Sequence, residues 1–118
     1  MCKLCQECNI HDRTAREAIK QIIHKIINLK KIHKIILFGS FAKGDYHQGS
    51  DIDLVIVGDF KERFFDRIGK ILDLNDTDFD LEPLVYTPEE FDKMIKEKRL
   101  FLQEVMNDGI IVYKLPSD

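Results

Sequence analysis

The fold of this chain is decided by two stretches, Gly39-Ser40-Phe41-Ala42-Lys43-Gly44-Asp45 and Ser50-Asp51-Ile52-Asp53-Leu54. The first is a turn of small residues that follows an apolar run, residues 34–38. The second places two aspartates at the start of another apolar run, residues 53–57. Short apolar runs bounded by glycine and polar residues are typical of buried strands. We therefore expect two strands, one ending at the glycine turn and one opening on the aspartates.

The glycine turn has the composition of a phosphate-binding site. Gly39 permits close approach of a ligand to the backbone, and the Ser40 hydroxyl is a further hydrogen-bond donor. A strand that leads into a short helix presents backbone N–H groups to an anion, and Lys43 can add a positive charge. A Gly-Ser pair alone is a weak signal, because most such pairs are ordinary turns.

Asp51 and Asp53 are spaced so that they can act together. Residues i and i+2 of a strand point to one face, with Cα atoms about 6.5–7 Å apart. Two carboxylates placed in this way can share a metal ion or bridge two ions, and hard oxygen ligands suit Mg²⁺, which also binds substrate phosphates. The alternative is a polar, solvated strand end. Because two carboxylates on one face repel each other, a cation between them is favoured.

The remaining apolar patterns predict a mixed α/β domain. We expect helices over residues 12–29, 61–74 and 100–107, a helix that begins at the N-cap Thr87, and strands over residues 79–86 and 110–113. The order is α-β-turn-β-α-β-α-α-β, an α/β (α+β) arrangement with a mixed sheet of about four strands flanked by helices.

Three details of these elements can be tested. The first helix is expected to end in the basic run of residues 30–33, which suits the negative pole of its dipole. Pro83 argues for an edge position or a local bulge in its strand. The buried side of the helix over residues 61–74 is expected to hold Phe64, Phe65, Ile68, Ile71 and Leu72.

Composition restricts the class of protein. The 118 residues, 44% of them apolar, suffice for a single domain, expected over residues 12–118. The net charge of -3 argues against direct nucleic-acid binding by bulk electrostatics. No apolar run approaches the roughly 20 residues of a membrane helix, and no secretory signal is visible. We therefore expect a soluble cytoplasmic protein.

A separate cysteine-rich segment is expected over residues 1–11. Cys2, Cys5, Cys8 and His11 have the spacing C-x2-C-x2-C-x2-H, and thiolates and an imidazole in such a run can bind zinc. Structural zinc sites usually take ligand pairs from two separate segments, however. The alternative is a terminal segment whose thiols bind no metal, and a reducing compartment suits thiols that do not cross-link the core.

The two motifs together resemble the pattern G-S-x-x-x-G…S-D-x-D-[LI] of the polymerase-β-like nucleotidyltransferase superfamily. The chain is similar to the minimal nucleotidyltransferases of that superfamily, which are often encoded beside a HEPN-domain protein. The resemblance extends from the first helix to the last strand. It implies a nucleotidyltransferase domain over residues 12–118.

The resemblance also implies roles for individual residues. Asp51 and Asp53 would hold two Mg²⁺ ions that bind the triphosphate of ATP or another nucleoside triphosphate and promote in-line attack on the α-phosphorus. Gly39 and Ser40 match the positions that contact the outer phosphates. Lys43 and Ser50 complete the candidate nucleotide-binding set.

A third metal-binding carboxylate is implied on a neighbouring strand. In close relatives that strand reads roughly V-D-L-V-V-Y-T-P-E-E-F, and aligning residues 86–91 places Glu82 at the carboxylate position. Asp80 lies two residues earlier on the same face and is the rival. A glutamate followed by Pro83 departs from the usual aspartate. Strand register favours Glu82 over Asp80, with an exposed strand face as the alternative to both.

Two functional hypotheses follow from the resemblance. The first is a Mg²⁺-dependent transferase that moves AMP from ATP to a hydroxyl, with a tyrosine of a HEPN toxin as the acceptor and this chain as the antitoxin. The second is an inactive module that neutralises its partner by binding. A small-molecule transferase of the aminoglycoside type is disfavoured, because such enzymes usually need a further domain or a dimer. Assembly with itself or with a partner stays open.

Overall fold

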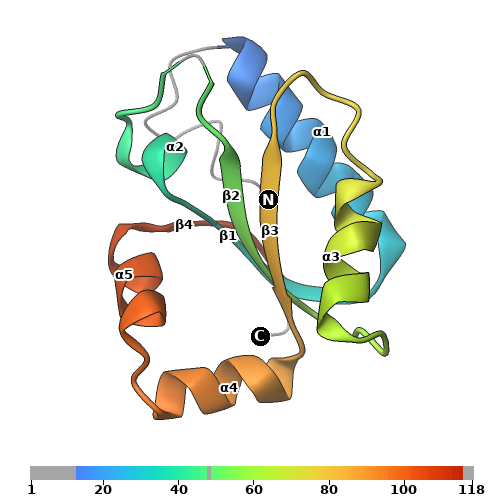
Figure 1. Cartoon of the computed structure of the whole chain (residues 1–118), viewed down its shortest axis with the longest axis vertical. Helices are drawn as coiled ribbons and strands as arrows, with labels where there is room; N and C mark the ends of the chain where they lie inside the picture. Colours follow the sequence, from blue (N-terminus) through green and yellow to red (C-terminus); the bar gives the residue numbers. More distant parts are fainter. Residues whose placement is uncertain (1–12, 48, 116–118) are drawn as a thin grey trace.

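A four-stranded mixed sheet organises the chain in this computed structural model, which describes residues 13–47 and 49–115 (Figure 1). The strands are β1 (Ile32–Phe38), β2 (Ile52–Gly58), β3 (Leu81–Tyr86) and β4 (Ile110–Lys114), in the spatial order β3-β2-β1-β4. The strand β1 is antiparallel to β2 and β4, whereas β2 and β3 are parallel. The helices are α1 (Arg13–Leu29), α2 (Ser40–Lys43), α3 (Phe64–Leu72), α4 (Pro88–Lys96) and α5 (Leu100–Asp108). The predicted order of elements and the mixed α+β class are confirmed.

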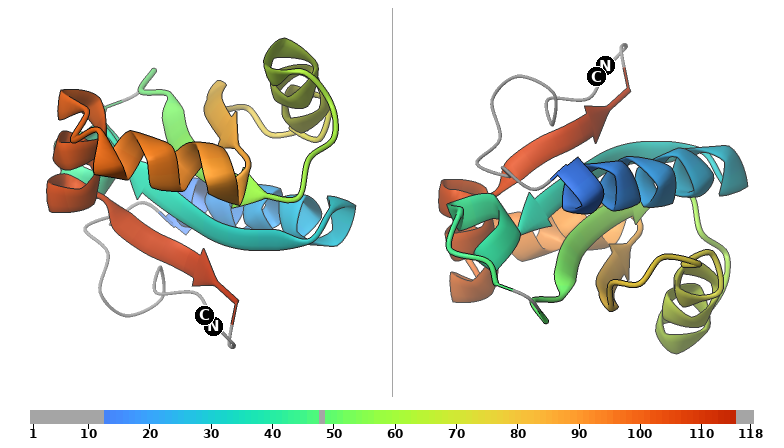
Figure 2. Two further views of the ribbon diagram at one scale, coloured as in Figure 1. Left: turned by 90° about the horizontal axis from the view of Figure 1, so that it is seen from below. Right: turned by 90° about the horizontal axis from the view of Figure 1, so that it is seen from above.

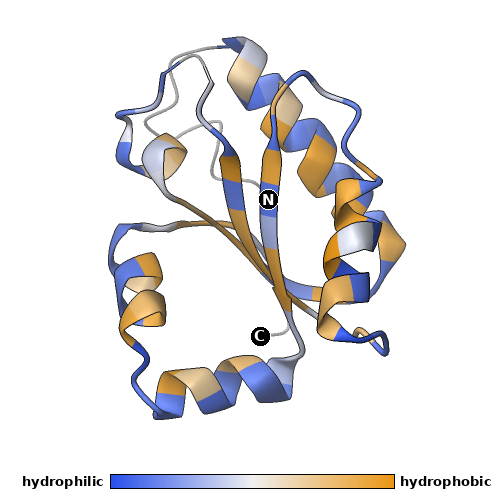
Figure 3. Cartoon of the chain, in the orientation of Figure 1, coloured by the Kyte–Doolittle hydropathy of each residue, from blue (hydrophilic) through white to orange (hydrophobic). Residues whose placement is uncertain are grey.

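Helices pack on both faces of the sheet. The apolar stripe of α1 packs on one face, where Ile35 is buried, and α4 and α5 pack on the other, where Ile36 lies against Phe91 and Leu102. Successive strand residues point to opposite faces, which explains why neighbours in β1 enter different clusters. Both views of Figure 2 show β4 at the side of the molecule opposite α3, and Figure 3 shows the central strands β1 and β2 as mostly hydrophobic.

Local sequence signals explain two of the element boundaries. The Thr87 hydroxyl accepts a hydrogen bond from the Glu90 backbone N–H at 3.2 Å, and the Glu90 carboxylate accepts one from the Thr87 N–H at 2.8 Å. This capping box, with Pro88 in the first turn, starts α4 as predicted. β3 is an edge strand of the sheet, which confirms the edge position inferred from Pro83.

The expected buried side of α3 is wrong in part. Phe65 is 83% exposed and Leu72 is 43% exposed, whereas Arg67 and Ile71 are buried. The side that faces the protein therefore includes Phe64, Arg67, Ile68 and Ile71. Apolar residues occur on both sides of this helix, so periodicity alone does not select the side that is buried.

The helix α1 ends before the basic run that was expected to form its last turn. Ile32 and His33 belong to β1, so the basic run of residues 30–33 does not form the end of α1. Asp12, where the first helix was expected to begin, and the cysteine-rich segment, residues 1–11, with its candidate zinc ligands, lie outside the described residues. Within the described ranges, no helix has the length and apolar character needed to cross a bilayer.

Candidate active site

Strand register brings two of the predicted carboxylates together. β2 and β3 are paired in parallel so that Asp53 lies opposite Glu82 and Ile52 lies opposite Leu81. Ile52 and Leu81 are both buried, so the carboxylates one residue further along project from the opposite face of the sheet. The Ile52 N–H donates to the Asp80 carbonyl at 2.8 Å, which fixes this register at the start of both strands.

The glycine turn lies directly against Asp53. Phe38, the last residue of β1, pairs with Asp53 on β2, and Gly39 follows it. Gly39 has φ +76°, a conformation that side chains disfavour, and a Cβ at this position would overlap the Asp53 Oδ2 atom. The sheet therefore places Gly39, Asp53 and Glu82 side by side on three adjacent strand ends.

The carboxylates repel each other at this point. The pKa of Asp53 is raised to about 7, first by burial, then by its hydrogen bond to Glu82 and by the negative charges of Glu82 and Asp51. A hydrogen bond between two carboxyl groups requires that one of them carry a proton. A bound cation would remove the repulsion that the proton now relieves, so the donor set fits a divalent ion with oxygen ligands.

These carboxylates suit a metal ion whose remaining ligands are water molecules and substrate phosphates. Among residues 13–47 and 49–115, no group of three or more His, Cys, Asp or Glu side chains is preformed as a metal cage. Mg²⁺ commonly binds through one or two carboxylates together with waters and substrate phosphates. Asp53 with Glu82, and Asp51 immediately before β2, match that mode of binding better than a closed cage.

The helix α2 holds the glycine turn in place. It is a single turn in which Phe41 and Ala42 are buried, and the Phe41 ring stacks on Tyr46 with ring centroids 4.7 Å apart. Ser40 and Lys43 are less buried and lie at the ends of this turn. Lys43 and Gly39 line a hollow of about 350 Å³. The candidate phosphate-binding residues are thus anchored by the core and open to a ligand.

Ser50 has a structural partner. Its hydroxyl accepts a hydrogen bond from the His47 backbone N–H at 2.9 Å, and the Ser50 N–H donates to the His47 carbonyl at 3.0 Å. The side chain is buried and closes the turn that leads into β2. Contact between Ser50 and a nucleotide stays a prediction.

The two rivals for the third carboxylate line different hollows. Asp53 and Glu82 share a hollow of about 570 Å³. Asp80 lines another hollow of about 580 Å³, together with Asp78 and Tyr46. The geometry therefore puts Glu82, and not Asp80, next to Asp53. Whether Glu82 acts in catalysis stays a prediction.

The walls of the shared hollow are residues for which no sequence pattern predicts a functional role. Besides the carboxylates it is lined by apolar side chains of α3, α5, β1 and β3: Phe38, Ile68, Leu72, Leu81, Pro83, Leu84 and Phe101. The Phe38 and Phe101 rings meet edge to face at 5.6 Å. These residues are far apart in the sequence, and only the packing of α3 and α5 beside the sheet gathers them.

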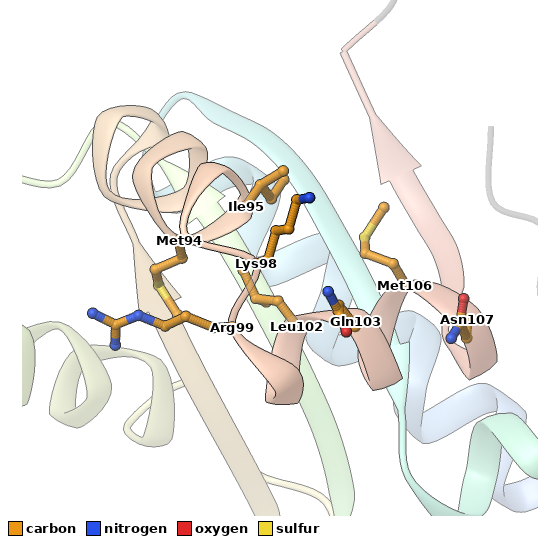
Figure 4. A pocket seen from close by; sticks show the side chains of 8 residues that line it. All are labelled: Met94, Ile95, Lys98, Arg99, Leu102, Gln103, Met106 and Asn107. Atoms are coloured by element: carbon orange, nitrogen blue, oxygen red, sulfur yellow. The ribbon is translucent and has the colours of Figure 1, made fainter.

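A further hollow lies between α4 and α5 (Figure 4). It measures about 290 Å³ and is lined by Met94, Ile95, Lys98, Arg99, Leu102, Gln103, Met106 and Asn107. None of these side chains is a carboxylate, so this hollow has no ligand of the type expected for Mg²⁺. It is distinct from the hollow that contains Asp53 and Glu82.

Comparison with known proteins identifies the family of the chain. The family model described as "Polymerase beta, Nucleotidyltransferase" matches residues 20–117. A provisionally assigned protein adenylyltransferase of Methanocaldococcus jannaschii is 35% identical over 88 residues, which are 70% of this chain and 80% of that protein. Another from the same organism is 51% identical over 45 residues, 36% of this chain and 45% of that protein. The chain thus spans less than half the length of this second relative.

Solved structures show the same fold. A provisionally assigned nucleotidyltransferase of Sulfolobus solfataricus superposes with a TM-score of 0.56 at 24% identity, covering 87% of this chain and 89% of that one. A chain from a toxin–antitoxin structure with AMP-PNP superposes with a TM-score of 0.54 at 21% identity, covering 86% and 75%. The family match spans most of the chain, from α1 onward. The chain belongs to the polymerase beta nucleotidyltransferase family, as one of its minimal nucleotidyltransferases.

Proposed function

We propose that the chain is a Mg²⁺-dependent enzyme that transfers AMP from ATP to a hydroxyl group of a partner protein. The observation that carries the proposal is the position of Asp53, which touches the Gly39 turn on one side and Glu82 on the other. A site for phosphates and a site for metal ions are thereby adjacent. Bound Mg²⁺ would neutralise the phosphates and lower the pKa of the acceptor hydroxyl.

The order of the strands gives the reaction a direction. The outer phosphates would lie at Gly39 and Ser40, beside β1, and the α-phosphorus would lie over Asp53 on β2. In-line displacement places the attacking oxygen opposite the departing pyrophosphate, which is the side of Glu82 and β3. The acceptor oxygen would form a bond to the α-phosphorus while the bond to pyrophosphate breaks, and the hydroxyl proton would pass to the Glu82 carboxylate.

The proposal also concerns the protein that is modified and the residue that accepts AMP. Two relatives are named as protein adenylyltransferases, which supports AMP as the transferred group and a protein as the acceptor. A fold neighbour comes from a toxin–antitoxin structure with an ATP analogue. We propose a tyrosine of a HEPN-domain toxin as the acceptor and an antitoxin role, in the cytoplasm, for this chain.

A transfer assay tests the proposal. The chain is incubated with α-labelled ATP, Mg²⁺ and a HEPN-domain protein encoded beside its gene, and label on that protein is measured. Asp53→Asn should reduce transfer at least about a hundredfold, the scale on which loss of one group stabilising transition-state charge acts. Asp92→Asn, an exposed aspartate of α4, is the matched control and should retain activity. Transfer by Asp53→Asn at the unaltered rate would contradict the proposal.

The same assay separates Glu82 from Asp80. Glu82→Gln should lower the transfer rate strongly, because it removes the carboxylate paired with Asp53. Asp80→Asn should have a small effect, since Asp80 lines a different hollow. The reverse order of effects would assign the third carboxylate to Asp80.

The assay also distinguishes the alternative function. Glu82 followed by Pro83, in place of the usual aspartate, favours a module that acts by binding its partner without turnover. In that case the unaltered chain transfers no label, and Asp53→Asn still suppresses the partner's toxicity in cells.

A further inference from the structure

Phe101 lies where the two hollows of the candidate site adjoin. It belongs to α5 and lines both the hollow of about 350 Å³ at the glycine turn and the hollow of about 570 Å³ beside Glu82. Phe38 lines both hollows as well. A ligand that reaches from the glycine turn to the carboxylates therefore passes these two rings.

The Phe101 ring is held in position and is still accessible. Phe38 packs against the buried cluster that contains Leu102 and Val105. The rings of Phe38 and Phe101 meet with their centroids 5.6 Å apart and their planes at 85°, a favoured arrangement for an aromatic pair. Phe101 itself is 38% exposed. The ring is thus fixed from the core side while part of its surface is open to a ligand.

The charges around Phe101 distinguish the two ends of a nucleotide. The smaller hollow contains Gly39 and Lys43 on one side, and a glycine turn with a lysine suits phosphates. On the α5 side it contains Glu104 and Asp108, which follow Phe101 by three and seven residues and share its helix face. Carboxylates repel phosphate but accept hydrogen bonds from the amino groups of a base. The α5 wall therefore suits an uncharged base better than a triphosphate.

The proposed reaction leaves the same wall for the nucleoside. Asp53 pairs with Phe38 on one side and with Glu82 on the other, so these two residues flank it. The acceptor would enter on the Glu82 side, and the outer phosphates would lie at the glycine turn. The wall formed by Phe38 and Phe101 is then the part of the site that remains for the nucleoside.

A second aromatic wall is a poorer candidate for the base. Tyr46 and Phe79 line the hollow that contains Asp80. Both rings pack on the buried Phe41, the Tyr46 ring stacked at 4.7 Å and the Phe79 ring edge to face at 6.0 Å. Among the described residues that line this hollow, none belongs to the glycine turn over residues 39–44.

We propose that Phe101 stacks on the base of the bound nucleoside triphosphate and that Phe38 holds the Phe101 ring in place for this contact. Bases stack on aromatic side chains through their π faces, and an apolar wall with a few polar groups is typical of a ligand site. The inference rests on the proposed function and adds to it the residue that binds the base.

The first test compares a nucleotide with its phosphates alone. The Kd values of ATP and of inorganic tripolyphosphate, each with Mg²⁺, are measured by calorimetry for Phe101→Ala and for the conservative variant Phe101→Tyr. Leu100→Ala is the matched control, because Leu100 is the preceding residue of α5, is 71% exposed and lines neither hollow.

The expected result is a loss of affinity for ATP alone. Phe101→Ala should raise the Kd of ATP at least about fivefold, the loss expected when one stack between a base and a ring is removed. The Kd of tripolyphosphate should not change, because this ligand has no base. Phe101→Tyr should recover most of the ATP affinity, and Leu100→Ala should match the unaltered chain.

The second test places a fluorescent ring at the same position. The sequence contains no tryptophan, so Phe101→Trp gives the chain a single indole. ATP with Mg²⁺ should change the emission of this indole, whereas tripolyphosphate with Mg²⁺ should not. Leu100→Trp, the matched control, should respond to neither ligand.

The outcomes that overturn the inference are distinguishable from failure of the proposed function. An unaltered Kd of ATP in Phe101→Ala would contradict base stacking, and a raised KM for the protein acceptor in that variant would assign the ring to the acceptor. Equal losses of ATP and tripolyphosphate affinity would assign Phe101 to the phosphate site. ATP binding that depends on Phe101, without any transfer of label, would contradict the proposed function alone. Absence of ATP binding by the unaltered chain would contradict both.

Discussion

Gly39 is subject to two independent constraints. Its φ of +76° disfavours any side chain, and the space where a Cβ would lie is taken by the Asp53 carboxylate. The first constraint concerns the backbone, whereas the second concerns contact with a candidate metal ligand. A single substitution at this position therefore disturbs the turn and the carboxylate together.

We predict that Gly39→Ala lowers the free energy of unfolding by about 1–3 kcal/mol, from backbone strain and steric overlap, and abolishes most of the transfer activity. Gly49→Ala is the matched control. Gly49 also has positive φ, at +108°, but a Cβ there meets nothing within 4 Å. Urea unfolding and the transfer assay measure the two effects. Equal loss of activity in both variants would show that strain, and not contact with Asp53, is responsible.

At the level of elements, Arg67 connects α3 to α4. Its side chain is 9% exposed, its Nε donates to the Glu62 carbonyl at 2.7 Å, and its Nη1 donates to the Glu90 carboxylate at 2.7 Å. Glu90 also completes the capping box of α4. The pair therefore fixes α3 relative to the helix that follows β3.

This ion pair predicts a pH dependence of stability. The hydrogen bond from Arg67 holds the pKa of Glu90 below its ordinary value. The pair therefore contributes stability above the unfolded pKa of about 4.3, and this contribution is lost as the pH falls through the lowered folded pKa. Glu90→Gln should cost about 1 kcal/mol at pH 7, because the Glu90 side chain is 46% exposed and partly screened.

Denaturant unfolding at pH 7 and at pH 3 tests this prediction by measuring the free energy of unfolding at each pH. Glu90→Gln should narrow the difference in stability between the two pH values. Glu89→Gln is the control, since Glu89 occupies the same first turn of α4, whereas the carboxylate that pairs with Arg67 is that of Glu90. A pH profile of Glu90→Gln that superimposes on that of the unaltered chain would contradict the assignment.

For the whole molecule, the repulsion at Asp53 couples metal binding to stability. With its pKa at about 7, the metal-free Asp53 carries a proton below that pH and a charge above it. A cation competes with this proton. Stabilisation by Mg²⁺ is therefore expected to grow as the pH rises through 7.

At a Mg²⁺ concentration tenfold above its Kd, the expected stabilisation at pH 8 is about 1.4 kcal/mol, or a rise in Tm of about 5 °C. At pH 5.5 the rise should be smaller. Asp53→Asn should show no rise at either pH, whereas Asp92→Asn should behave as the unaltered chain. Differential scanning fluorimetry measures all four cases. An equal rise in Asp53→Asn would place the ion elsewhere.

The local motifs were predictable because short spacings determine them. The two-residue period of a strand predicts one face for Asp51 and Asp53, of which Asp53 lies in β2 and Asp51 directly before it. The Thr87–Glu90 spacing defines the capping box. The side of α3 that is buried was not predictable in the same way. It depends on the ion pair between Arg67 and Glu90, which lies 23 residues further along the chain. An arginine is also an unusual residue for a core position.

The hollow beside Glu82 could not be predicted from the sequence, for a related reason. Its walls include Phe38, Ile68 and Phe101, and no spacing rule connects residues that meet only through the packing of separate helices. Glu82 is intermediate between the two cases. The sequence proposes it through one alignment of β3, and the pairing of β3 with β2 places it opposite Asp53.

Pro83 has a consequence for aggregation. It lies in the edge strand β3, and proline has no N–H to donate to a neighbouring strand. A strand from another molecule that tried to extend the sheet at this edge would miss a hydrogen bond next to Glu82. The edge beside the candidate active site is thereby protected from edge-to-edge association with the sheet of another molecule.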